Sequence, residues 1–208
     1  MAKPRLIGLT GSIGMGKSTA LAMLARLGAV TLSADEIVHA LYRPGAPGTD
    51  VVRALAPAAV GADGVDRAVL SQLIAADPRL LPHLEHRIHA LVRQQQRWLV
   101  RRTAARARWI ALDIPLLFET AQQDRFDLIL SVSASQRLQR ERVMRRPGMT
   151  AAKFRLIKAK QTPDHLKRYW SDRVIPTGLG RGRTWRGLSA MLNHVRIRPA
   201  RRWRPSWR

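Results

Sequence analysis

The sequence feature that most constrains the fold is a glycine-rich loop between a strand-like apolar run at 6–9 and a helical pattern that starts at Lys17. The loop reads Gly11-Ser12-Ile13-Gly14-Met15-Gly16-Lys17-Ser18 and is followed by Thr19. Its glycines let the backbone fold closely around an anion, so that amide N–H groups and the helix N-terminus point at phosphate oxygens. The alternative is a ligand-free turn between strand and helix, which the matching flanking elements disfavour.

Two residues at the end of this loop predict the chemistry of the bound donor. Lys17 brings a positive charge to the β- and γ-phosphates, and the Ser18 hydroxyl is expected on Mg²⁺, which bridges the same phosphates. We therefore expect Mg²⁺ with ATP as the phosphoryl donor. The predicted ATP-binding residues of the loop are Gly11, Ser12, Ile13, Gly14, Met15, Gly16, Lys17, Ser18 and Thr19.

The rest of the chain predicts an α/β domain with parallel strands. The short apolar run at 30–32 is typical of a strand. The mostly continuous apolar runs at 109–113 and 127–132 are typical of buried parallel strands. Residues 50–108 have a helical period and are interpreted as an insertion. Basic helices are predicted within 136–146 and 150–161, and a last short strand at 173–175.

Charge and composition limit the partners and the compartment. The chain has 37 Lys plus Arg against 14 Asp plus Glu, a net charge of +23, and no acidic residue follows Asp172. The basic end carries Trp203 and Trp207 among arginines, for which we expect non-specific attraction to polyanions and no specific nucleic acid. Cysteine is absent and no apolar run approaches membrane-spanning length, so a cytoplasmic protein without a membrane association is expected.

Other classes of phosphate-loop protein fit the sequence less well. A GTPase needs an Asn-Lys-x-Asp element, yet the sole asparagine is Asn193, which His194 follows. A nucleic-acid motor is usually a larger chain, whereas this one has 208 residues. A small-molecule kinase is favoured.

The motifs of this chain resemble those of the dephospho-CoA kinase family, in order and spacing, over roughly residues 6–186. The segments that carry the resemblance are Ile7-Gly8-Leu9-Thr10-Gly11, Ala34-Asp35, Asp113-Ile114-Pro115-Leu116-Leu117-Phe118-Glu119, and the single positions Arg142, Arg146 and Gln161. The resemblance implies ATP-dependent phosphorylation of the ribose 3′-hydroxyl of dephospho-CoA, which gives coenzyme A and ADP in the last step of coenzyme A synthesis.

The resemblance also implies the architecture. We expect a three-layer P-loop kinase with a mostly parallel five-stranded sheet, spanning residues 1–192. Within it, a helical acceptor-binding insertion occupies about 50–108 and a helical lid about 136–165. A basic, irregular C-terminal tail, residues 193–208, follows.

Residue chemistry and the resemblance together suggest the remaining roles. Asp35 follows the second strand and is the predicted catalytic base that orients the acceptor hydroxyl, although an acid there also complements a helix dipole. Asp113 ends a strand and is a predicted Mg²⁺ ligand, with a structural cap as the alternative. Arg142 is expected to stabilise the transferring phosphoryl group and Arg146 to bind ATP, against the alternative of a solvated basic face.

The acceptor is expected to bind at Asp35, His89, Pro115, Leu116, Leu117 and Glu119. For His89, a packing or surface role on its helix is the alternative. The chain departs from the family pattern at Ser33, Ala90 and Thr177; the last of these replaces an asparagine on the adenine side. The two remaining alternatives are a small kinase for another nucleotide or sugar and an RNA-binding ATPase. A monomer or weak homo-oligomer is expected.

Overall fold

The computed structural model describes residues 4–194, so nearly all of the predicted C-terminal tail, residues 193–208, lies outside the described residues. The chain divides into two compact units. The first unit contains the residues up to Thr31 and those from Thr103 onward, and the second is Leu32–Arg102. The second unit therefore begins earlier than the insertion expected at about 50–108.

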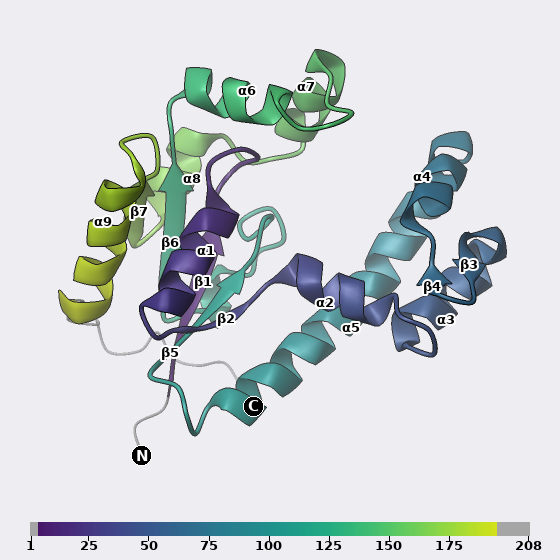
Figure 1. Ribbon diagram of the computed structural model, residues 1–208, viewed down its shortest axis with the longest axis horizontal. Helices are drawn as coiled ribbons and strands as arrows, with labels where there is room; N and C mark the ends of the chain where they lie inside the picture. Colours follow the sequence, from purple (N-terminus) through teal and green to yellow (C-terminus); the bar gives the residue numbers. More distant parts are fainter. Residues whose placement is uncertain (1–3, 195–208) are drawn as a thin grey trace. The chain divides into compact units, whose positions relative to one another are not determined.

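A five-stranded sheet forms the centre of the first unit, in the order β2-β5-β1-β6-β7 (Figure 1). The strands are β1 (Arg5–Thr10), β2 (Val30–Leu32), β5 (Trp109–Asp113), β6 (Leu128–Ser133) and β7 (Arg173–Pro176). β1 runs parallel to both β5 and β6, and β6 runs parallel to β7. The three central strands, β5, β1 and β6, are buried at nearly every position, as expected for a sheet covered by helices on each side.

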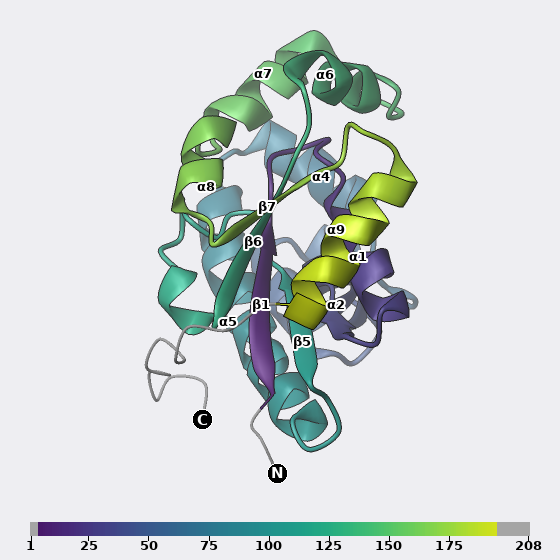
Figure 2. The same cartoon turned by 90° about the vertical axis from the view of Figure 1, so that its left-hand side faces the viewer.

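Helices cover both faces of this sheet and complete the three layers. α1 (Lys17–Arg26) and α9 (Arg181–His194) contact each other on one face, and α8 (Asp164–Trp170) contacts β6 on the other (Figure 2). α1 buries Ala20, Leu21, Met23 and Leu24, and α9 buries Leu188, Met191 and Leu192 in the same core. The predicted α/β fold class is thus confirmed.

Two helices lie beyond the C-terminal ends of the strands, in the range expected for the lid (Figures 1 and 2). α6 (Gln136–Met144) begins after Ser135, whose side chain caps the helix by accepting from Leu138 N. α7 (Ala151–Ala159) begins after Thr150, whose side chain accepts from Lys153 N. A short 3₁₀ turn, η2 (Gln123–Arg125), precedes β6.

The second unit is mostly helical and has its own core. Its elements are α2 (Ala34–Leu41), α3 (Pro47–Leu55), η1 (Pro57–Ala59), β3 (Val60–Gly61), β4 (Gly64–Val65), α4 (Arg67–Ala76) and α5 (Leu80–Thr103). Ile37 and Leu41 of α2 pack with Val52, Leu84 and Ile88, which explains why the unit begins before α3. The antiparallel β3–β4 pair was not predicted, because strands of two residues leave no periodic pattern.

Among residues 4–194, no helix has both the length and the apolar character that crossing a membrane would require.

Candidate functional site

The glycine-rich loop connects β1 to α1, as the sequence predicts. Gly14 and Gly16 have φ of 76° and 91°, a left-handed backbone that side chains disfavour. The loop also has no room for larger residues, because a Cβ at Gly14 would lie 2.6 Å from Val143 Cγ2, and one at Gly11 would lie 2.7 Å from the carbonyl oxygen of Val132. Backbone conformation and packing therefore both require glycine.

The open end of the loop is arranged to receive an anion. Gly16 precedes the first turn of α1, and no side chain caps that turn, so its N–H groups remain available to a ligand. Ser18 and Thr19 are exposed there. Lys17 Nζ donates to the carbonyl oxygen of Gly11 at 3.0 Å, which keeps the ammonium group beside the loop.

Polar side chains from α6 and from the segment after α7 hold the outer side of the loop. Gln139 Nε2 donates to the carbonyl oxygen of Ile13 at 2.8 Å, and Gln161 Oε1 accepts from Ile13 N at 3.0 Å. Ile13 is thus fixed through both of its backbone groups. Sequence reasoning missed Gln139. Its importance is visible in the structure, where this glutamine is only 1% exposed although it lies in a basic helix.

Thr177 and Arg142 anchor the other part of the loop. Thr177 Oγ1 donates to the carbonyl oxygen of Met15 at 2.7 Å and also lies 3.3 Å from that of Ser133. Arg142 Nη2 donates to the carbonyl oxygen of Thr177 at 2.8 Å, and Nη1 to that of Gly14 at 3.4 Å. These acceptors are neutral, so the guanidinium keeps its full positive charge next to the loop. Arg146 is exposed just after α6.

Replacing Thr177 with valine is expected to weaken the first unit. Valine keeps the shape of threonine but leaves the buried carbonyl oxygen of Met15 without this donor, at a cost of about 1–3 kcal/mol in the free energy of unfolding. Chemical denaturation measures the loss. Thr177→Ser is the matched control because it keeps the hydroxyl, and equal losses for the two variants would contradict the importance of these hydrogen bonds.

Asp113 lies at the same edge of the sheet as the loop. It is the last residue of β5, is 7% exposed and pairs in register with Leu9, two residues before Gly11. The Asp113 carboxylate and the Ser18 hydroxyl are oxygen donors of the kind that Mg²⁺ prefers, and this metal usually binds few protein ligands when phosphates supply others. The donor set therefore fits Mg²⁺. Within the described part of the chain, no cluster of three or more acidic, His or Cys side chains forms a larger metal site.

The segment after β5, predicted to contact the acceptor, is held in place by buried contacts. The Pro115 carbonyl oxygen accepts from Thr10 Oγ1 at 3.4 Å and from Lys167 Nζ at 3.3 Å. Leu116 is partly buried, whereas Leu117 is fully buried and packs against the backbone of Gly8. The contact of Pro115, Leu116 and Leu117 with the acceptor stays a prediction, and for Leu117 the structure places the side chain in the core.

Glu119 forms an ion pair that sequence reasoning missed. Its Oε1 lies 2.8 Å from Lys167 Nζ and accepts from Thr162 N at 2.6 Å. Burial raises the pKa of the Glu119 carboxyl, but hydrogen bonds from Lys167 and backbone amides, together with the charge of Lys167, outweigh it and hold the pKa below its ordinary value. The carboxylate is therefore ionised and engaged within the protein, and its contact with an acceptor stays a prediction.

Asp35 and His89, the other predicted acceptor residues, belong to the second unit. Asp35 lies in the first turn of α2, where Ser33 caps the helix by accepting from Glu36 N at 3.3 Å. Ser33, one of the departures from the family pattern, thus serves as the N-cap of α2. His89 follows buried Ile88 on α5. Both Asp35 and His89 are exposed, so each is accessible to a ligand.

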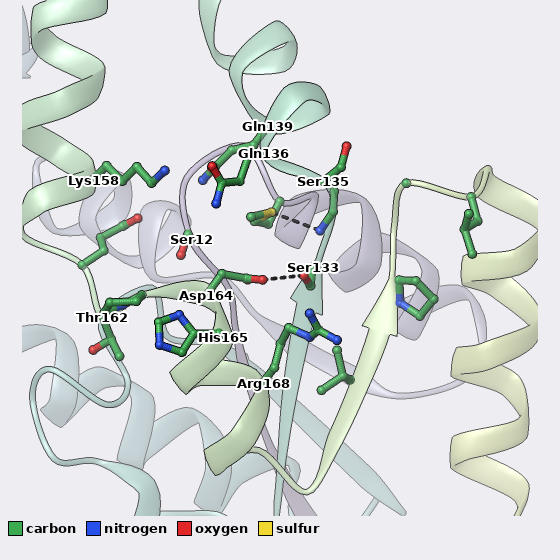
Figure 3. A pocket seen from close by; sticks show the side chains of 18 residues that line it. Ser12, Ser133, Ser135, Gln136, Gln139, Lys158, Thr162, Asp164, His165 and Arg168 are labelled. Carbon is green, nitrogen blue, oxygen red and sulfur yellow. Dashed lines mark hydrogen bonds between the residues drawn. The ribbon is translucent and has the colours of Figure 1, made fainter.

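A cavity of about 1000 Å³ opens beside the phosphate loop within the first unit (Figure 3). Ser12 lines it from the loop and Gln139 from α6, while Lys158, His165 and Arg168 supply basic groups. Asp164 accepts from Ser133 Oγ at 2.7 Å across its floor. The sequence did not reveal this cavity, because its walls come from segments distant in the chain.

Comparisons with known proteins point in one direction. Residues 5–178 match the family model for dephospho-CoA kinase. A dephospho-CoA kinase of Rhodospirillum rubrum is 44% identical over 201 residues, which cover 96% of this chain and 95% of the relative. A dephospho-CoA kinase of Rhizobium meliloti is 43% identical over 192 residues, which cover 92% of this chain and 98% of the relative.

Solved structures share the fold of this chain. A crystal structure from Thermus thermophilus has a TM-score of 0.77 at 31% identity, covering 93% of this chain and 99% of that chain. A shikimate kinase from Acinetobacter baumannii has a TM-score of 0.53 at 17% identity, covering 91% of this chain and 94% of that chain. The second comparison supports the fold alone.

Proposed function

The chain belongs to the dephospho-CoA kinase family, and from this premise we propose that the residues described above carry out the transfer from ATP to dephospho-CoA. The activity is an ATP-dependent phosphorylation of the 3′-hydroxyl of dephospho-CoA, the last step of coenzyme A synthesis. The single observation that supports this assignment most is the phosphate loop with Lys17 beside an uncapped α1 N-terminus, inside a family match that spans 5–178.

On the donor side, the loop amides and Lys17 bind the β- and γ-phosphates of ATP. Ser18 and Asp113 would hold Mg²⁺, which would neutralise charge on the phosphates. Arg142 lies next to the loop, and the carbonyl and hydroxyl oxygens that it contacts are neutral and do not offset its charge. Arg142 therefore stabilises the negative charge of the transferring group. Arg146 is exposed near the end of α6 and contributes to ATP binding.

On the acceptor side, Asp35 accepts or orients the proton of the attacking hydroxyl. This role requires a carboxylate that a ligand can reach, and Asp35 is exposed in the first turn of α2. His89, Pro115 and Leu116 contact the acceptor, whereas buried Leu117 supports this segment from the core. The basic groups of the cavity beside Ser12 suit a phosphorylated portion of either substrate.

Both substrates are small anions, so the reaction requires neither a nucleic acid nor a membrane. We infer that it takes place in the cytoplasm. We also infer that the protein is a monomer or a weak homo-oligomer. ATP and dephospho-CoA are the partners.

A panel of acceptors tests the function. Purified protein is incubated with ATP, Mg²⁺ and, separately, dephospho-CoA, shikimate, nucleoside monophosphates and single-stranded RNA. We expect 3′-phosphate formation on dephospho-CoA alone, measured by mass spectrometry, and no increase of ATP hydrolysis with RNA. Transfer to a nucleoside monophosphate without transfer to dephospho-CoA would reject the proposal, as would ATP hydrolysis that depends on RNA.

A further inference from the structure

Lys167 is the most deeply buried charged residue of the candidate site. It lies on α8, and its residue is 0% exposed, whereas its partner Glu119 is 15% exposed. The pair joins α8 to the segment after β5 through the 2.8 Å contact between Lys167 Nζ and Glu119 Oε1. No local sequence pattern indicates this pair, because the two residues belong to separate elements.

The Lys167 side of this pair is linked to the end of β1, where the phosphate loop begins. Lys167 Nζ also donates to the carbonyl oxygen of Pro115, two residues after Asp113. That carbonyl oxygen accepts from Thr10 Oγ1, and Thr10 directly precedes Gly11. Lys167 therefore fixes the backbone that follows Asp113 relative to the strand that leads into the loop.

The Glu119 side of this pair is linked to the phosphate loop through the residues after α7. Glu119 Oε1 accepts from Thr162 N at 2.6 Å. The neighbouring Gln161 accepts from Ile13 N in the middle of the loop. Glu119 thus fixes the segment that carries Gln161, and both branches of the network end at the phosphate loop.

Stability alone does not account for such a pair. Desolvating two charges is costly, and apolar residues of similar volume often replace a buried ion pair without loss of stability. Glu119 Oε2 is also buried and has no hydrogen-bond partner in the part of the chain that the structure describes, which adds to the cost. The cost of this pair therefore favours a role in holding geometry over a role in stability.

We propose that the Lys167–Glu119 ion pair is a positioning element for phosphoryl transfer, which aligns the Asp113 strand end and Gln161 with the phosphate loop. The inference rests on the proposed function. Neither residue contacts the reacting atoms in this role; both act through Pro115, Thr162 and Gln161. Small displacements of such supporting groups lower the rate of the chemical step more than they weaken binding.

The test compares single and double replacements of the pair. Lys167→Met and Glu119→Gln each leave one buried group unpaired, so both are expected to lower the melting temperature. The double variant Lys167→Met/Glu119→Leu removes both charges and is expected to recover thermal stability. Its kcat is nevertheless expected to stay roughly 10- to 100-fold below wild type, with the KM values for ATP and dephospho-CoA changed by less than about threefold.

The exposed Arg79–Asp77 pair, with 2.9 Å between Arg79 Nε and Asp77 Oδ1, provides the control. The variant Arg79→Met/Asp77→Asn is expected to keep the wild-type kcat. A double variant of the buried pair that regains kcat together with stability would overturn the inference, as would one in which only KM changes. Wild-type protein unable to phosphorylate dephospho-CoA would instead refute the proposed function, so the two failures are distinct.

Discussion

Replacing Lys17 with alanine is expected to lower kcat for dephospho-CoA phosphorylation by roughly 100- to 1000-fold, the usual effect of losing one preorganised group that stabilises transition-state charge. Lys17 Nζ lies beside the loop at the carbonyl oxygen of Gly11, which places its ammonium group where the β- and γ-phosphates are proposed to bind. Single-turnover formation of the 3′-phosphorylated product measures the effect, and thermal unfolding checks that the fold is intact.

Lys153 offers a matched control for this experiment. Its Nζ also donates to a glycine carbonyl oxygen, that of Gly148 at 3.1 Å, but on the exposed side of α7. Lys153→Ala is therefore expected to keep the wild-type kcat within about twofold, as surface substitutions usually do. A Lys17→Ala protein with more than a tenth of wild-type activity would contradict the proposed role of the phosphate loop.

The parts of the fold that the sequence predicted well are those with strong local patterns. The loop at 11–18 combines glycines with a lysine between a strand and a helix, and the structure has it between β1 and α1. β5 and β6 are mostly continuous apolar runs, which is the pattern of buried parallel strands. Each of these patterns lies within a few residues, so no knowledge of distant contacts was needed.

The parts that were missed depend on contacts between distant segments or on weak local patterns. α9 begins in an arginine- and glycine-rich stretch, and its apolar side consists of the partly buried Trp185 and, near its end, Leu188, Met191 and Leu192. The Lys167–Glu119 pair and the hydrogen bond of Thr177 to the loop join residues far apart in the chain. Residue type alone does not reveal such partners, since most lysines and threonines are exposed.

The structure also refines the prediction for the arginines after β6. Sequence chemistry could not choose among Arg137, Arg140, Arg142, Arg145 and Arg146. Arg142 is the one whose guanidinium contacts the loop and Thr177, whereas Arg137 and Arg140 are exposed on α6. The helix therefore presents one arginine to the phosphate loop because Gln139, Arg142 and Val143 share the face that packs on it.

Replacing Asp35 with asparagine is expected to lower kcat by roughly 100- to 10,000-fold, the range typical of losing a general base. Asparagine has nearly the same size as aspartate but cannot accept the proton of the 3′-hydroxyl at neutral pH. The phosphate loop belongs entirely to the first unit and Asp35 to the second, so the affinity for ATP is expected to stay unchanged. Rapid-quench kinetics gives kcat, and equilibrium titration with a fluorescent ATP analogue gives the affinity.

Glu36 separates this catalytic role from the alternative, in which Asp35 only complements the dipole of α2. Asp35 and Glu36 are adjacent, both exposed and both in the first turn of the helix, so they favour its N-terminus in the same way. Glu36→Gln is therefore expected to lose the same small amount of stability as Asp35→Asn, at most about 1 kcal/mol, while keeping its kcat. The comparison works because the helix dipole affects neighbouring carboxylates equally, whereas proton transfer depends on one of them. If the two variants lose equal stability and neither loses kcat, Asp35 is only a helix-terminal acid and another residue is the base.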